Sequence, residues 1–139
     1  MSSYMERTER LDWPGWRPFF LVAALYDLVL GAVFMVFGEQ ILDWIGMELP
    51  PHIAYIQLAA VFVFVQGLSY LFVYFDPPAN LGLVRVGVVY KAAYAGLALW
   101  YLVIGLLPSG FFIPWAVVDV LFMIGFLLFL RAATRSRQG

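Results

Sequence analysis

Residues 111–130 read FFIPWAVVDVLFMIGFLLFL and contain a single ionisable side chain, the carboxyl group of Asp119. A helix needs about 20 mostly apolar residues to cross the hydrocarbon core of a bilayer, and this stretch has that length. Three other stretches have the same character, at residues 18–37, 53–75 and 83–107. Prolines, glycines or charged residues bound each of them. The sequence therefore predicts an all-α fold, a four-helix transmembrane bundle.

The composition agrees with a membrane protein. Of the 139 residues, 64% are hydrophobic and 12% are charged, against about 45–50% and about 25% in soluble domains. A soluble fold of this size needs more polar surface, so the composition excludes a soluble enzyme, a nucleic-acid binder and a disordered linker. With no cysteine and one histidine, one chain cannot build a sulfur-ligated zinc site, an iron–sulfur cluster or a bis-histidine haem site. We predict no metal, no cofactor and no catalytic set.

The connections between the stretches are short, which predicts that consecutive helices are antiparallel neighbours. The transmembrane domain would span residues 18–130, between an N-terminal tail, residues 1–17, and a basic C-terminal tail, residues 131–139. One connection, Glu39–Leu49, places apolar residues at helical spacing among acidic ones. This pattern predicts a short amphipathic helix on the membrane surface, with an irregular loop as the alternative.

Basic residues indicate how the helices are oriented. Arginines lie in both tails and, at Arg85, just after the second connection, whereas the first and third connections contain no Lys or Arg. Lys and Arg are retained on the cytoplasmic side of membrane proteins. Both termini are therefore expected in the cytoplasm, and the acidic first connection outside.

Each of the four stretches carries one polar side chain at a similar depth. Counted from the cytoplasmic ends at about 1.5 Å per residue, the depths are about 12–16 Å for Asp27, Gln66, Lys91 and Asp119. Charged side chains inside membrane helices are rare and usually face the bundle interior. The sequence therefore predicts one interior cluster, with Lys91 between two carboxylates and Gln66 nearby.

The predicted cluster has one negative charge in excess, because it combines two carboxylates with one ammonium group. Uncompensated charge is costly in a low-dielectric interior. Either one carboxyl holds a proton or a second cation approaches, and we expect Asp27 or Asp119 to hold or share a proton. The long side chain of Arg85 is expected to reach the surface. Hydroxyl groups on adjacent helix faces could support the cluster, from Tyr26, Tyr90 and Tyr94.

Small residues recur within the predicted helices and allow close helix contacts. Ala92 and Gly96 form such a pair on the third stretch, which packing inside the bundle explains at least as well as dimerisation does. Gly31, Gly67 and Gly125 allow similar contacts in the other helices.

The order of these features resembles that of small four-helix bacterial membrane proteins of the DoxX-like kind, over residues 18–130. The residues that carry the resemblance are Tyr26-Asp27, Leu30-Gly31, Gln57, Gln66-Gly67, Asp76-Pro77-Pro78-Ala79-Asn80, Arg85, Gly87, Lys91 and Asp119. The resemblance implies a multi-pass protein of the bacterial inner (cytoplasmic) membrane. Some members of such families are similar to membrane subunits that work beside quinone-linked oxidoreductases. The resemblance implies no catalytic residues.

Two functional hypotheses follow from the sequence. The first is a non-catalytic accessory or scaffold subunit of a larger membrane complex, with a protein partner or a second copy, because the chain is small and has no catalytic set. The second is a protein that binds a small hydrophobic ligand, such as a lipid or quinone, or moves a proton or solute. Asp27, Lys91 and Asp119 would carry that function, with Gln66 orienting. The same cluster is also explained by a purely structural role.

Overall fold

The computed structural model describes residues 13–138, and side chains for residues 15–135. The predicted N-terminal tail therefore lies mostly outside the described residues. Within the described range, each of four long helices is long and apolar enough to cross a membrane, which confirms the predicted fold class. They are α2 (Trp13–Trp44), α3 (Ala54–Phe75), α4 (Leu81–Val103) and α5 (Phe112–Gln138), with a short 3₁₀ helix, η1 (Pro78–Asn80), before α4.

Helix α2 is longer than the first apolar stretch and changes direction once. Its backbone leaves the helical region at Phe37, where φ is −115° and ψ is 16°. This kink falls where the first membrane span was predicted to end. The segment after it is helical as far as Trp44, so the predicted amphipathic helix is present but ends before Leu49. Pro18, the first residue of the predicted span, lies inside the helix, because α2 already begins at Trp13.

The C-terminal ends of the last two helices also differ from the predicted boundaries. Helix α5 continues to Gln138, so most of the predicted basic tail is helical. Its arginines lie near the helix C-terminus, where positive charge stabilises a helix. Helix α4 ends at Val103 rather than at Leu107. Gly105 stops it with a φ of +74°, which glycine adopts at little cost, and the amide of Leu106 donates to the carbonyl of Tyr101 at 2.8 Å. This pattern is a Schellman motif.

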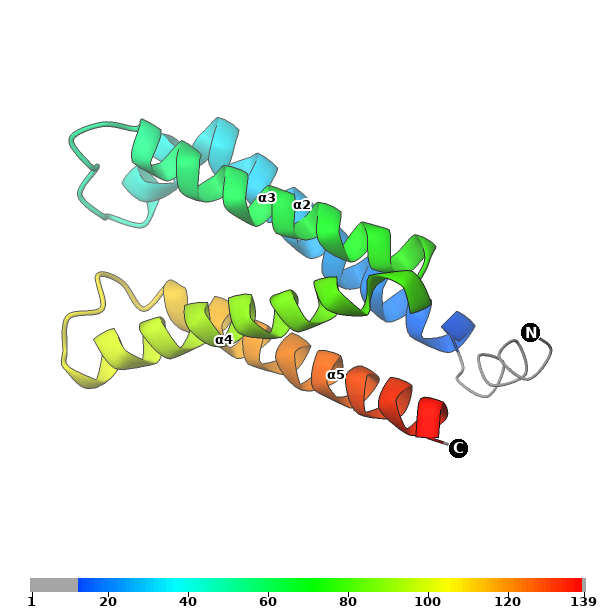
Figure 1. Ribbon diagram of the computed structural model, residues 1–139. Coiled ribbons are helices and arrows are strands. Elements are labelled where there is room, and N and C mark those ends of the chain that lie inside the picture. The colour runs from blue at the N-terminus through cyan, green and yellow to red at the C-terminus, as the bar shows by residue number, and fades with distance from the viewer. Residues whose placement is uncertain (1–12, 139) are drawn as a thin grey trace.

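The four helices form two antiparallel hairpins, α2–α3 and α4–α5 (Figure 1). The hairpins meet at the end that holds η1, the start of α2 and the end of α5, which we call the terminal end, and they diverge toward the other end (Figure 1). A buried apolar core lies where they meet and includes Phe20, Tyr70, Val84, Phe126 and Phe129. We call the opposite end, with residues 45–53 and 104–111, the loop end. The bundle is therefore closed at the terminal end and open at the loop end.

Glycines bring α2 and α3 into close contact along the first hairpin. A Cβ atom on Gly31 would lie 2.6 Å from the backbone nitrogen of Phe64, and one on Gly67 would lie 2.7 Å from that of Leu28. Such distances leave no room for a side chain. The small residues therefore act in packing inside this hairpin, whereas Gly96 on α4 faces open space.

Candidate functional site

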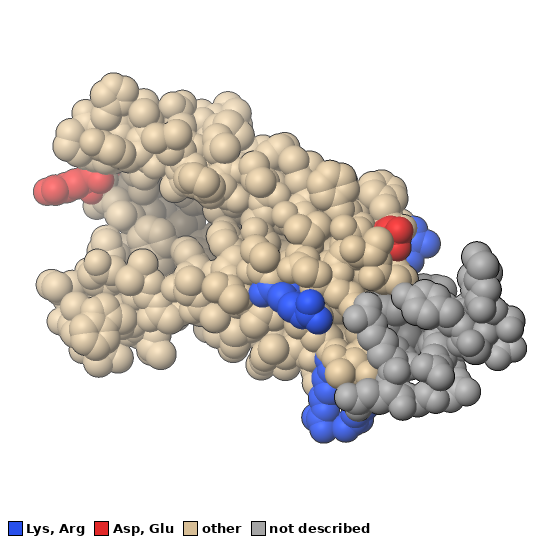
Figure 2. Space-filling view, in the orientation of Figure 1, with Lys and Arg blue, Asp and Glu red and all other residues tan. Residues whose placement is uncertain are grey.

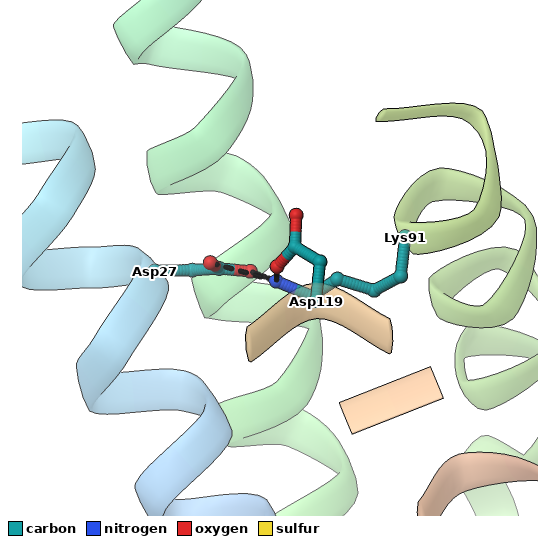
Figure 3. Close-up of polar contacts among 3 residues, drawn as sticks. All are labelled: Asp27, Lys91 and Asp119. Carbon is teal, nitrogen blue, oxygen red and sulfur yellow. Dashed lines mark hydrogen bonds and ion pairs between the residues drawn. The ribbon is translucent and has the colours of Figure 1, made fainter. Parts of the chain in front are cut away.

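Three charged side chains from three helices meet where the hairpins begin to diverge. Nζ of Lys91 on α4 donates to Oδ1 and Oδ2 of Asp27 on α2 at 3.0 Å each, and to Oδ1 of Asp119 on α5 at 2.8 Å (Figure 3). The exposed fractions are 1% for Asp27 and Lys91 and 6% for Asp119. The buried salt bridge expected from the sequence is therefore present. We call these residues the charged cluster.

The two carboxylates of the charged cluster are not equivalent. Both oxygens of Asp27 accept from Lys91, whereas only Oδ1 of Asp119 does. The other oxygen of Asp119 points away from the ammonium group (Figure 3), and among the described residues no donor is bonded to it. An ammonium group has three N–H donors, and the three contacts with the carboxylates use them all. Lys91 therefore has no donor left for Oδ2 of Asp119.

Aromatic rings surround the ammonium group. The ring centroids of four residues lie 5.3 to 5.7 Å from Nζ of Lys91, within the range of cation–π attraction: Tyr26, Tyr70, Tyr90 and Phe122. The hydroxyl groups of Tyr26 and Tyr70 are buried and have no hydrogen-bond partner among the described residues. Of the three tyrosines expected to supply hydroxyl donors, Tyr26 thus presents its ring face to Lys91 and donates to neither carboxylate.

The sequence interpretation did not single out Tyr70 or Phe122. Helical spacing could have found both, since residues three or four apart share a helix face. Tyr70 follows Gln66 by four residues on α3, and Phe122 follows Asp119 by three on α5. Tyr70 is fully buried.

The other residues predicted to belong to the site lie around the cluster rather than in it. Gln66 is buried on α3, but its side-chain nitrogen has no hydrogen-bond partner among the described residues, so it does not donate to either carboxylate. Tyr94 lines the cavity described below. Arg85 is exposed on α4, which agrees with the expectation that its side chain reaches the surface.

A cavity of about 200 Å³ lies between the diverging hairpins and is lined by residues of all four helices. Its walls are almost entirely apolar and aromatic, and Asp27 and Asp119 lie at its inner end. Figure 2 shows the molecule hollowed between α3 and α4. The charged cluster therefore closes the inner end of an apolar cavity.

Aromatic contacts of α2 with α5, and with Phe111 just before α5, close the far side of this cavity. The ring centroids of Tyr26 and Trp115 are 6.0 Å apart, and those of Phe34 and Phe111 are 6.4 Å apart. On the near side, Val63 of α3 and Tyr94 of α4 line the cavity, and the surface is hollowed between these two helices (Figure 2). The cavity therefore opens between α3 and α4.

Charges on the surface are distributed unevenly around the cavity. Near the loop end, Glu39, Asp43 and Glu48 are exposed, and residues 38–53 and 104–111 contain no Lys or Arg. In Figure 2 acidic side chains project at the loop end, and the basic ones lie further toward the terminal end. The electrostatic field near the wide end of the cavity therefore favours cations.

No family model, curated protein or solved structure matches this chain. The resemblance to DoxX-like proteins therefore stays a prediction. Within the part of the chain that the structure describes, no three His, Cys, Asp or Glu residues are grouped so as to hold a metal ion. The charged cluster and the cavity are thus the features from which function can be inferred.

Proposed function

We propose that this protein binds a small, largely apolar molecule in the cavity between its two hairpins. The observation that carries the proposal is an apolar cavity of about 200 Å³ that ends on a buried carboxylate. Ligand sites commonly combine apolar walls with a few polar groups that orient the ligand. Because a cavity of about 150 Å³ accommodates benzene, this one has room for a single substituted ring or the end of an aliphatic chain.

The proposed ligand reaches the cavity from the bilayer. Helices α3 and α4, which flank the opening, are both long and apolar enough to span a membrane, so the opening between them faces the lipid acyl chains. An apolar molecule concentrates in that phase and enters sideways. The end of a lipid chain and a quinone ring both have this chemistry. We also propose that the protein lies in the inner membrane of a bacterium with both termini in the cytoplasm, as the distribution of basic residues and the resemblance to DoxX-like proteins imply.

Photolabelling with a neutral single-ring probe tests the proposal. The purified protein, in phosphatidylcholine vesicles, is irradiated with 3-(trifluoromethyl)-3-phenyldiazirine, and the labelled residues are mapped by mass spectrometry. We expect saturable labelling at cavity residues such as Tyr94 and Trp115. Ala59 is exposed and lines the cavity, so Ala59→Trp should reduce this labelling by filling the opening.

The matched control is Ala93→Trp, because Ala93 is exposed on α4 and does not line the cavity. This variant should label like the unmodified protein. Labelling spread evenly over the outer helix faces, and unaffected by Ala59→Trp, would contradict a ligand cavity.

A role as an accessory or scaffold subunit is the second candidate function. The observation that favours it is the outer face of α4, where Ala92 is exposed and a Cβ atom on Gly96 would meet nothing within 4 Å. Small residues on an outer face let another membrane helix approach closely. Purification in mild detergent at native expression levels tests this candidate. A monodisperse lone monomer would count against it.

A further inference from the structure

The geometry of the charged cluster points to the class of ligand: we propose that the cavity binds a lipophilic amine, whose ammonium group contacts Oδ2 of Asp119. This inference rests on the proposed ligand cavity and adds the chemistry of the ligand's polar end. It starts from the inequality of the two carboxylates. Oδ2 of Asp119 is the carboxylate oxygen of the cluster that no described donor satisfies.

This oxygen is placed to meet a ligand. Asp119 is 94% buried, since its exposed fraction is 6%, and it lines the cavity. Lys91 cannot also satisfy Oδ2, because its three N–H groups already contact the other carboxylate oxygens. Oδ2 therefore either carries a proton itself or accepts from a donor that enters the cavity, and the inference commits to the second.

Charge balance selects a cation over a neutral or anionic ligand. With both carboxyl groups ionised, the two carboxylates and one ammonium group give the cluster a net charge of −1, which either a proton or a bound cation can neutralise. A charge taken out of water is costly, and attraction to an opposite charge offsets that cost. A ligand hydroxyl group would donate a hydrogen bond but leave this charge uncompensated, and an anion would be repelled by both carboxylates. A ligand ammonium group supplies the donor and makes the cluster neutral.

The walls of the cavity and the surface charge favour the same ligand. Aromatic rings attract cations that lie over their faces, and Tyr26, Tyr94 and Trp115 line the cavity beside Asp119. The exposed carboxylates near the loop end, including Asp43 and Glu48, attract a cation toward the wide end. The cavity volume of about 200 Å³ limits the bound part to an amine on one ring or one short chain.

Two photoprobes that differ in one group test the inference. Both carry the trifluoromethyl-diazirinyl-phenyl group, one with an aminomethyl and the other with a hydroxymethyl substituent on the ring. Benzylamines are protonated at neutral pH and benzyl alcohols are not. The full-length protein in phosphatidylcholine vesicles is labelled with each probe over a concentration series, and labelling at Tyr94 and Trp115 is normalised to that of the lipid-facing Phe62.

We expect the amine to reach half-maximal labelling of the cavity at a concentration about tenfold lower than the alcohol does, a difference of about 1.4 kcal/mol. Asp119→Asn should remove this preference. Asp76→Asn is the matched control, because Asp76 is exposed and lies between α3 and η1, and it should keep the preference. The comparison of the two probes on the unmodified protein holds even if Asp119→Asn does not fold.

The outcomes separate this inference from the proposed function. Saturable labelling of the cavity by both probes at equal concentrations would overturn the amine inference, as expected if Asp119 carries a proton, and would leave the ligand cavity standing. A preference for the alcohol, or a preference for the amine that survives Asp119→Asn, would also overturn it. If neither probe labels the cavity above the lipid-facing surface, the proposed function itself fails.

Discussion

Nζ of Lys91 lies 3.0 Å from both carboxylate oxygens of Asp27, so this ion pair joins α4 of one hairpin to α2 of the other. Beyond the core at the terminal end, the two hairpins diverge (Figure 1). The pair is thus a polar bond between two units that are otherwise held together mainly at one end. This arrangement gives the cluster a structural role as well as the proposed binding role.

Removing the cation should therefore destabilise the protein strongly. Polar contacts in membrane bundles contribute only about 0.6 kcal/mol on average, but Lys91→Met leaves two buried carboxylates without a partner. Breaking a buried ion pair in this way costs about 3–5 kcal/mol. We expect a drop of this order in the free energy of unfolding, seen as a lower midpoint of thermal aggregation in detergent.

The exposed Arg85, two turns earlier on the same helix, provides the control for Lys91→Met. Arg85→Met removes the same charge at the surface, so it should change stability by less than about 0.5 kcal/mol. Adding Asp27→Asn to Lys91→Met should restore part of the lost stability, because one unpaired carboxylate is then removed. Equal midpoints for Lys91→Met and Arg85→Met would show that the ion pair does not hold the hairpins together.

Close packing of α2 and α3 predicts opposite effects for two glycine substitutions. Gly31→Ala would place a methyl group 2.6 Å from a backbone nitrogen of α3, so the helices must separate, at a cost of about 1–3 kcal/mol. Gly96→Ala meets nothing within 4 Å and replaces a poor helix former with a good one. It should leave stability unchanged or raise it.

The comparison of these two alanine variants is made by thermal unfolding in one detergent, so that differences in micelle size cancel. A loss for Gly96→Ala as large as that for Gly31→Ala would indicate that Gly96 also packs against a helix, which would then have to come from another molecule. Stability that is unchanged in Gly31→Ala would contradict the close contact between α2 and α3.

Much of the fold follows from the sequence, because the bilayer permits few solutions. About 20 apolar residues bounded by prolines or charges define a membrane helix, and the second helix was predicted to within one residue, at Ile53 rather than Ala54. Helix ends were predicted less well. Helix α4 stops four residues early because the positive φ of Gly105 decides the end, and hydropathy does not register backbone conformation.

The contact of Asp27, Lys91 and Asp119 could also be anticipated, since charges buried in the bilayer seek partners. The cavity could not. Hydropathy shows that the helices are apolar, but it does not show that α4 diverges from α3 toward the loop end. The angle between these two helices decides whether Tyr94 and Trp115 line a cavity or fill a core. The ring faces around Lys91 were missed for a related reason, because tyrosines in a sequence suggest hydroxyl donors before they suggest aromatic walls.

The orientation of the helices gives the last prediction, which uses the absence of cysteine from the chain. A single cysteine introduced as His52→Cys lies in the exposed first connection, and one introduced as Ala79→Cys lies exposed in η1. If arginines hold the terminal end in the cytoplasm, a membrane-impermeant maleimide should label the first variant in intact cells. It should label the second only after the membrane is permeabilised.

Each variant is the other's control, because both are exposed and differ only in the end of the bundle that they report. The reverse labelling pattern would invert the orientation, and labelling of both in intact cells would mean that the two connections lie on the same side, which four membrane-spanning helices do not allow.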